Sequence, residues 1–171
     1  KAFSALPQSL PQGESSQAEK ADPMELPFID QHGLQVSATP EQTWQALLGL
    51  LERPTGNAVF VRLLGCQDTQ PGGPRPLALG SSLPGFHIAE FQPPARLVLA
   101  GRHRFSRYLV IFQLQSVGEG RTLLRADTHA EFPGLFGRLY RLLVISSRIH
   151  VVVTRLVLRS IAKSAERRAR S

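Results

Sequence analysis

The spacing of apolar residues changes along the chain and predicts the order of its elements. Residues 28–37 are strand-like, and a helical spacing of apolar residues follows the segment Thr39-Pro40-Glu41-Gln42. Thr39 suits the N-cap, Pro40 the first helical position, and Gln42 can close a capping box. We therefore expect one strand and then a short helix that ends near residues 53–56. The apolar positions of this helix are Trp44, Leu47, Leu48 and Leu51.

Short β-rich runs separated by turn residues fill the middle of the chain. Consecutive strands joined by short turns pair antiparallel, because parallel pairing needs long crossovers. The pattern predicts an antiparallel sheet of about six or seven strands. The runs after the first strand are residues 58–66, 77–83, 86–91, 96–101, 108–117 and 122–132.

A long helix is expected from Leu135 to about Arg168, where Gly137 is the one glycine and there is no proline. Thirty-odd helical residues would span about 50 Å. Strands followed by helices indicate an α+β domain. Residues 1–25 are rich in Ser, Gln, Pro and Glu and predict a flexible tail, so the domain would occupy residues 26–171.

Basic residues set the expected orientation of the long helix. Six of them project into one sector, which must face water because unpaired buried guanidinium is costly. These residues are Arg138, Arg141, Arg148, Arg155, Arg159 and Lys163. The opposite sector is the predicted buried stripe, formed by Leu139, Leu143, Ser146, His150, Val153, Val157 and Ile161.

Two polar residues of that stripe, Ser146 and His150, are four positions apart and therefore neighbours on a helix. Two interpretations stay open. His150 could be a core histidine bonded to a backbone carbonyl, with Ser146 chosen for size. Alternatively, the pair could be a polar handle in an otherwise apolar cavity, which is how many binding sites are built.

On the sheet, one alternating set of the last strand should face the helix. It is mostly small, which would leave volume for a cavity: Leu124, Ala126, Thr128, Ala130 and Phe132. In the preceding strand the corresponding face is Tyr108, Val110, Phe112 and Leu114. Because Leu109 and Ile111 alternate with these residues, both faces of that strand are expected to be covered.

Residues 101–108 form the densest polar-aromatic cluster of the chain. The arginines there could bind an anion, or they could protect a charged strand edge from aggregation. His103 shares alternation parity with Leu97 and Leu99, which would point it inward. His150, His103 and Tyr108 are the candidate acid–base residues.

The net charge is +7, from 20 basic and 13 acidic residues. A basic surface could meet nucleic acid or an anionic membrane, or it could serve solubility alone. The single cysteine, Cys66, allows no internal disulfide and favours a reducing compartment, so we expect a cytoplasmic protein. Residues 1–17 lack a continuous apolar run, so we expect no secretory signal. Arg148, His150 and Arg155 interrupt the most hydrophobic stretch, so we expect no membrane-spanning helix there.

The sequence lacks the usual signatures of metal and cofactor sites. The five histidines have no paired ligand spacing and Cys66 has no cysteine partner. No phosphate-binding or nucleophile-elbow motif occurs. We expect neither metal nor cofactor.

Several local sequences resemble the SRPBCC group, also called START-like or Bet v 1-like helix-grip proteins, over residues 28–168. Residues 38–44, Ala-Thr-Pro-Glu-Gln-Thr-Trp, are similar to the helix entry of the group, and residues 90–97 are similar to its proline turn between strands. Residues 105–134 look like small bacterial members of polyketide cyclase/dehydrase type. The resemblance implies a sheet that grips the long helix around a deep apolar cavity.

Three functions follow as alternatives. The resemblance implies binding, transport or sensing of a hydrophobic small molecule such as a lipid, polyketide or steroid-like compound. A second alternative is a polyketide cyclase- or dehydratase-like enzyme that uses His150, with His103 or Tyr108, as acid and base. The third is an interaction module whose basic helix face meets RNA, a membrane or a protein. No catalytic residues are common to the group, so none is transferred.

Overall fold

The structure is a computed structural model that describes residues 26–53, 66, 68, 70–135, 137, 139 and 149–170. The tail at residues 1–25 and all but the last residue of the strand expected at 58–66 lie outside these residues. The described elements are β1 (Phe28–Val36), α1 (Pro40–Leu51), β2 (Ser82–Leu83), β3 (Phe86–Gln92), β4 (Arg96–His103), β5 (Ser106–Ser116), β6 (Thr122–Glu131) and α4 (Ile149–Ala169). The predicted α+β class is confirmed.

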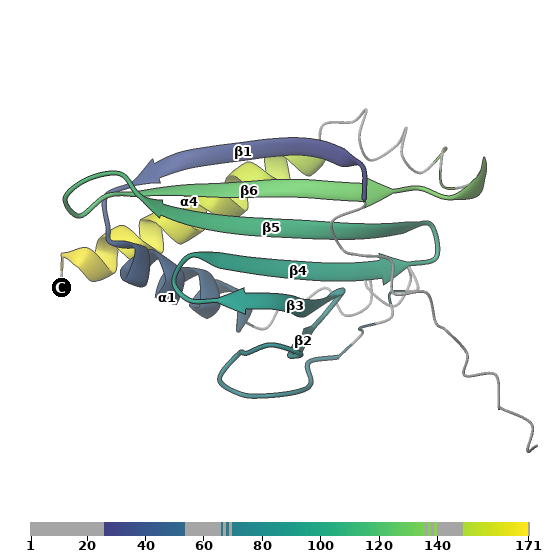
Figure 1. The fold of residues 1–171 in the computed structure, drawn as a ribbon, viewed down its shortest axis with the longest axis horizontal. Helices are drawn as coiled ribbons and strands as arrows, with labels where there is room; N and C mark the ends of the chain where they lie inside the picture. The colour runs from purple at the N-terminus through teal and green to yellow at the C-terminus, as the bar shows by residue number, and fades with distance from the viewer. Residues whose placement is uncertain are drawn as a thin grey trace, which may run out of the picture.

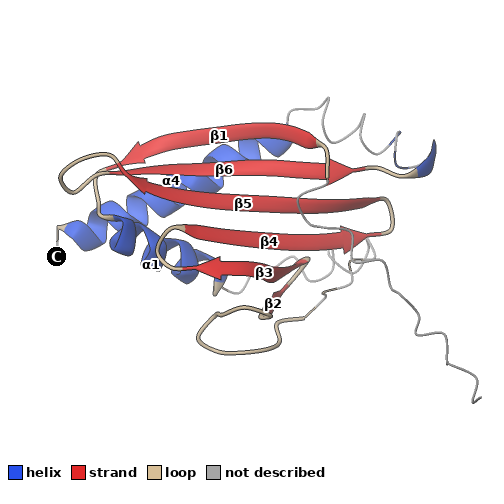
Figure 2. Ribbon diagram, viewed as in Figure 1, coloured by secondary structure: helices blue, strands red, loops and turns tan. Residues whose placement is uncertain are grey.

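The described strands form one antiparallel sheet of six strands in the order β1-β6-β5-β4-β3-β2. Neighbours in sequence pair through short turns, whereas β6 returns to pair with β1. Both helices lie on the same face of this sheet (Figure 1). Figure 2 shows α4 running obliquely behind the strands, with the C-terminus beside α1. The expected arrangement, a sheet that grips a long C-terminal helix, is therefore correct.

The helix α1 begins as the sequence predicts. The Thr39 side chain accepts a hydrogen bond from the Gln42 N–H at 3.3 Å, and the Gln42 side chain accepts one from the Thr39 N–H at 3.0 Å. This reciprocal capping box satisfies two amides that a helix start otherwise leaves open. It fixes the register that buries Trp44 and Leu47.

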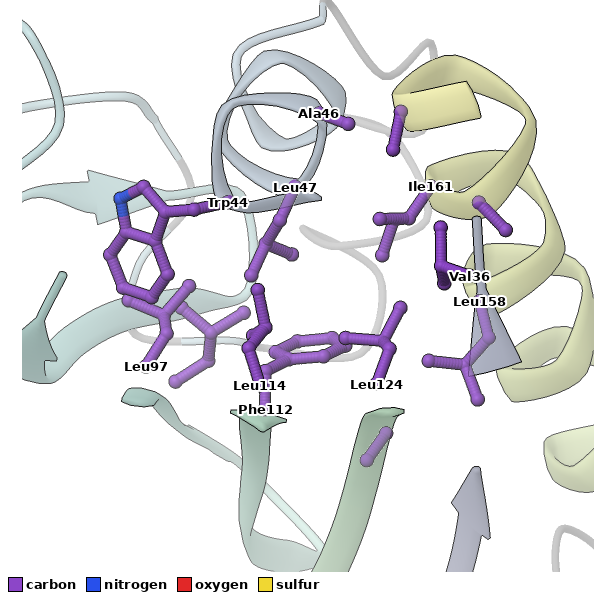
Figure 3. Close-up of a cluster of buried hydrophobic side chains, with 14 of the residues drawn as sticks. Val36, Trp44, Ala46, Leu47, Leu97, Phe112, Leu114, Leu124, Leu158 and Ile161 are labelled. Atoms are coloured by element: carbon purple, nitrogen blue, oxygen red, sulfur yellow. The ribbon is translucent and has the colours of Figure 1, made fainter. Parts of the chain in front are cut away.

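Apolar side chains pack on both faces of the sheet. The main cluster lies between the sheet and the two helices, and it includes Trp44 and Leu47 of α1, Phe112 and Leu124 of the sheet, and Leu158 of α4 (Figure 3). We call this the concave face. A smaller cluster on the opposite face contains Val98, Leu109 and Ile111, and Leu26 packs against it. The expectation that β5 is covered on both faces is confirmed.

One expectation for the strands, and one of the two alternatives given for residues 101–108, are wrong. Only Ser82–Leu83 of the run 77–83 is a strand. The residues before it turn, because Gly80 has φ +82° and the Ser81 hydroxyl both accepts from the Ala78 N–H and donates to the Pro74 carbonyl. Residues 101–108 are not a strand edge, because β4 and β5 lie inside the sheet and these residues form the hairpin end that joins them.

The orientation predicted for α4 is partly wrong. Its buried positions in the described part are Leu158, Ile161, Ala162 and Ala165, whereas Val153 is 51% exposed. Arg155, Arg159 and Lys163 are exposed as expected. However, Arg155 lies only about 60° around the helix from Leu158, so it reaches water from the flank. The sequence-based prediction places Arg155 opposite the core. The predicted buried stripe is therefore rotated around the helix axis, by about one residue position, from the buried face that the structure shows.

Candidate functional site

The polar side chains of the concave face gather where β1 meets α4. On β1, Leu34 and Val36 pack into the main cluster, and alternation places Asp30 and His32 on the same face. Leu158 and Ile161 bring α4 onto this face, so the start of α4 crosses the beginning of β1. His150 lies in the first described turn of the helix.

Asp30 lies between two imidazoles. Its Oδ2 is 3.1 Å from Nε2 of His32, and its Oδ1 is 3.3 Å from Nε2 of His150. The side chains of His32, Asp30 and His150 are 15%, 20% and 24% exposed, so water screens them only in part. Each imidazole donates from Nε2 to the carboxylate, and this leaves Nδ1 of each ring as the acceptor. We call these three residues the Asp30 cluster.

Next to Asp30, across the β1–β6 ladder, lies Thr128. Its side chain points to the concave face and the residue is 6% exposed. Its Oγ1 has no hydrogen-bond partner within the part of the chain that the structure describes. A buried hydroxyl without a partner is unusual and costs about 1–3 kcal/mol. The apolar residues flanking Thr128 on this face are Val110, Ala126 and Ala130.

A second polar group surrounds His103 at the β4–β5 turn. Nδ1 of His103 accepts from the Phe105 N–H at 3.1 Å, so the neutral ring carries its proton on Nε2. That nitrogen lies 2.9 Å from the Ser106 hydroxyl, to which it donates. Burial lowers the pKa of His103 below its ordinary value. Because His103 donates to Ser106, it is not placed to take the hydroxyl proton, and the pair does not form an activated nucleophile.

Tyr108 is engaged in the framework of the same region. Its hydroxyl donates to the Gly85 carbonyl at 2.6 Å, and its ring lies against Phe86 and His103. The Sγ of the buried Cys66 lies 4.0 Å from this hydroxyl. These contacts hold Tyr108 in the framework of the sheet. His103 on β4 lies three strand positions from β1, about 14 Å along the sheet, and Tyr108 on β5 lies two positions away, about 10 Å, so neither joins His150 at Asp30.

The residues that the sequence predicts for a ligand cavity are distributed as follows. Leu124, Ala126 and Phe112 are in the main cluster, Val110 packs against it, and Thr128 and Ala130 share the face of Leu124 and Ala126. Val157 is partly buried against the cluster. The expected burial of Leu139 and Val153 is wrong, since they are 57% and 51% exposed. Leu143 and Ser146 lie outside the described residues.

Sequence reasoning missed Asp30 and His32. The signal was present, because Asp30, His32, Leu34 and Val36 alternate along one strand. A charged residue in a strand is expected to face solvent, and only the contact with His150 on α4 explains why Asp30 faces the helix. The two residues join His150 only through the pairing of the first strand with the last and the crossing of the helix.

Within the described ranges, no group of three or more His, Cys, Asp or Glu side chains is arranged to hold a metal ion. The same residues include no helix with the length and apolar character needed to cross a bilayer.

No protein-family model matches the chain, and no curated protein matches it. Solved structures do match. Norcoclaurine synthase of Thalictrum flavum, a point mutant in complex with a transition-state analogue, superposes with a TM-score of 0.53 at 11% identity, over 82% of this chain and 94% of that one. The Aha1 dimer from Colwellia psychrerythraea gives a TM-score of 0.51 at 18% identity, over 80% and 94%. At these identities the similarity concerns the fold: the chain has the Bet v 1-like helix-grip fold that its sequence motifs suggested.

Proposed function

We propose that this protein binds an apolar small molecule on the concave face of its sheet, with the polar end of the molecule at Thr128 and the Asp30 cluster. The fold gives general support, since one face of a curved sheet lies under a long helix. The specific support comes from the distribution of polar and apolar groups on that face.

The observation that carries the proposal is the hydroxyl of Thr128. A threonine side chain has the volume of valine, and a strand facing a core would accept valine without the cost of an unbonded oxygen. The hydroxyl accepts and donates, so a bound hydroxyl, carbonyl or amine could supply the partner that the described residues do not. Small-molecule sites typically have a small number of polar groups on an otherwise apolar surface.

The location follows from the packing. The large side chains of the main cluster, including Phe112, Leu114 and Leu158, fill the concave face beside α1 and the second half of α4. Toward the start of α4, the inward residues of β6 are Ala126, Thr128 and Ala130, which are small. An apolar ligand would therefore occupy the end of the face where small side chains and the Asp30 cluster lie.

The test is native mass spectrometry of the purified protein, followed by thermal unfolding with long-chain alcohols, sterols and polycyclic aromatic compounds. The proposal expects a co-purifying molecule or a rise in the unfolding temperature with at least one of these classes. The Thr128→Val variant should show a smaller rise. Absence of both signals from the wild-type protein would contradict the proposal.

A second candidate function is acid–base catalysis on the bound molecule, and the contact between Asp30 and His150 favours it. A carboxylate that holds one imidazole nitrogen orients the ring and leaves the other nitrogen to accept a proton from a substrate. On this account His150→Gln abolishes turnover while ligand-induced stabilisation persists. Loss of both together would assign His150 to binding instead.

A further inference from the structure

The outward side of α4 combines positive charge with exposed aliphatic side chains. Val152, Leu156, Arg159 and Lys163 follow one another at spacings of four, three and four residues and therefore share one face. All four are exposed, and Val152 and Leu156 are each 55% exposed. We call this row the outer α4 face. It lies opposite Leu158 and Ile161, which attach the helix to the sheet.

Positive charge dominates the described part of this helix. Its exposed basic residues are Arg155, Arg159, Lys163, Arg167 and Arg168, and Arg170 follows directly after it. Its one acidic residue, Glu166, accepts a hydrogen bond from the Ser37 N–H at 3.2 Å and so turns toward the sheet. Arg167 and Arg168 are in the last turn, where the helix dipole favours cations. The dipole does not account for Arg159 and Lys163, which lie one to three turns earlier.

We propose that the outer α4 face docks on an anionic lipid bilayer, with Arg159 and Lys163 at the head groups and Val152 and Leu156 in the outer acyl region. Basic residues beside exposed aliphatic residues on one helix face are what interfacial binding requires. Each basic residue near an anionic surface strengthens binding roughly fivefold. This inference is independent of what the concave face binds.

The composition of α4 favours lipid over nucleic acid. Phosphate contacts would satisfy the arginines, but they would leave Val152 and Leu156 without apolar partners. Single-stranded nucleic acid is usually held by aromatic side chains that stack on bases, and the part of α4 that the structure describes, Ile149–Ala169, contains no Phe, Tyr or Trp. A bilayer surface satisfies both the charged and the apolar parts of the face.

The experiment is vesicle co-flotation of the full chain with two compositions, phosphatidylcholine alone and phosphatidylcholine mixed with phosphatidylglycerol. We expect binding to the mixed vesicles only, with a steep loss as salt increases. The double variant Arg159→Glu/Lys163→Glu should weaken binding at least about tenfold. The variant Val152→Ser/Leu156→Ser should weaken it severalfold with the charge unchanged. All four side chains are exposed, so the fold should survive, which circular dichroism would confirm.

The matched control is Arg102→Glu/Arg104→Glu, which makes the same charge change at the exposed β4–β5 turn and should retain most of the binding. No binding of the wild-type protein to the mixed vesicles would overturn the proposal. Equal losses in the control and in Arg159→Glu/Lys163→Glu would reduce the effect to net charge and also overturn it. A third result would also overturn it: the Val152→Ser/Leu156→Ser variant binds the mixed vesicles as well as the wild type does, and the wild-type protein binds an RNA oligonucleotide. The face would then be a nucleic-acid surface.

Discussion

Nε2 of His150 lies 3.3 Å from Oδ1 of Asp30, a contact between residues 120 positions apart in the sequence. It connects the first strand of the sheet to the first described turn of α4, where the neighbouring residues Val152 and Val153 are exposed and add little packing. We therefore expect the contact to help hold the start of the helix against the concave face. The second half of α4 is anchored differently, by Leu158, Ile161 and Ala165.

Replacing Asp30 with Asn should loosen the start of α4. The neutral amide keeps the size of the side chain but removes the charge that attracts both imidazoles. The amide has one acceptor oxygen where the carboxylate has two, so one imidazole N–H loses its partner, and we expect a loss of about 0.5–1.5 kcal/mol in unfolding free energy. Amide hydrogen exchange should accelerate in the first turns of α4 and stay unchanged around Ile161.

The matched control is Asp127→Asn, on the outward side of β6, where the carboxylate accepts from the Gln31 amide at 2.8 Å. It removes the same charge away from the helix. If both variants altered exchange in α4 to the same extent, the contact between Asp30 and His150 would have no special role in holding the helix.

Replacing Thr128 with Val should raise the stability of the ligand-free protein by about 1 kcal/mol, because it deletes a buried hydroxyl that has no partner among the residues the structure describes. The same change should reduce stabilisation by any ligand that bonds to this hydroxyl. Chemical denaturation with and without ligand measures both effects.

Thr122→Val is the comparison, because the Thr122 hydroxyl is also buried but donates to the Ala38 carbonyl at 2.8 Å. This variant should lose about 1–2 kcal/mol and leave ligand binding unchanged. A loss of stability in Thr128→Val as large as in Thr122→Val would show that the Thr128 hydroxyl already has a hydrogen-bond partner in the protein. It would then not be a group reserved for a ligand.

The stability of the protein should fall as the pH drops below about 6.5, in part because of His103. Burial lowers the pKa of His103 in the folded state, so below the ordinary value the unfolded chain takes up a proton that the folded chain does not. Above that pH both states are neutral and the contribution vanishes. His103→Gln should therefore reduce the slope of unfolding free energy against pH in this range. An unchanged slope would show that His103 titrates alike in both states.

Two glycine-to-alanine changes should have opposite signs. A Cβ at Gly101 would collide with the Gly85 carbonyl and the Tyr108 ring, so Gly101→Ala should cost about 1–3 kcal/mol. A Cβ at Gly49, inside α1, would meet only the tip of Arg168 at 3.6 Å. Gly49→Ala should therefore add about 0.5–1 kcal/mol, since alanine favours the helix. A stable Gly101→Ala variant would show that the Tyr108 ring does not pack as described.

The sequence predicts the framework well because its signals are local. The capping box at Thr39 and Gln42, the glycines of the β5–β6 turn and the alternation of β6 each depend on a few neighbouring residues, and all are found in the structure. The prediction of a strand at residues 77–83 is wrong for a local reason as well. Its apolar residues hide a turn at Gly80 whose hydrogen bonds come from a serine side chain.

The candidate site was less predictable because it is assembled from distant segments. His150 could be chosen from the helical pattern, but its partner Asp30 depends on the crossing of α4 over β1. The rotation of α4 depended on which side of the helix Arg155 uses to reach water, and a long flexible side chain leaves that open. The placement of His103 and Tyr108 away from His150 follows from strand order, which spacing alone does not give.

The most direct test of the account is the mass of the intact protein released from its purified state under non-denaturing conditions, before and after extraction with organic solvent. The account predicts an additional mass that disappears on extraction, belongs to a largely apolar molecule with one polar end, and is diminished in Thr128→Val. A bare protein mass in every preparation, with no apolar compound able to raise its unfolding temperature, would contradict it.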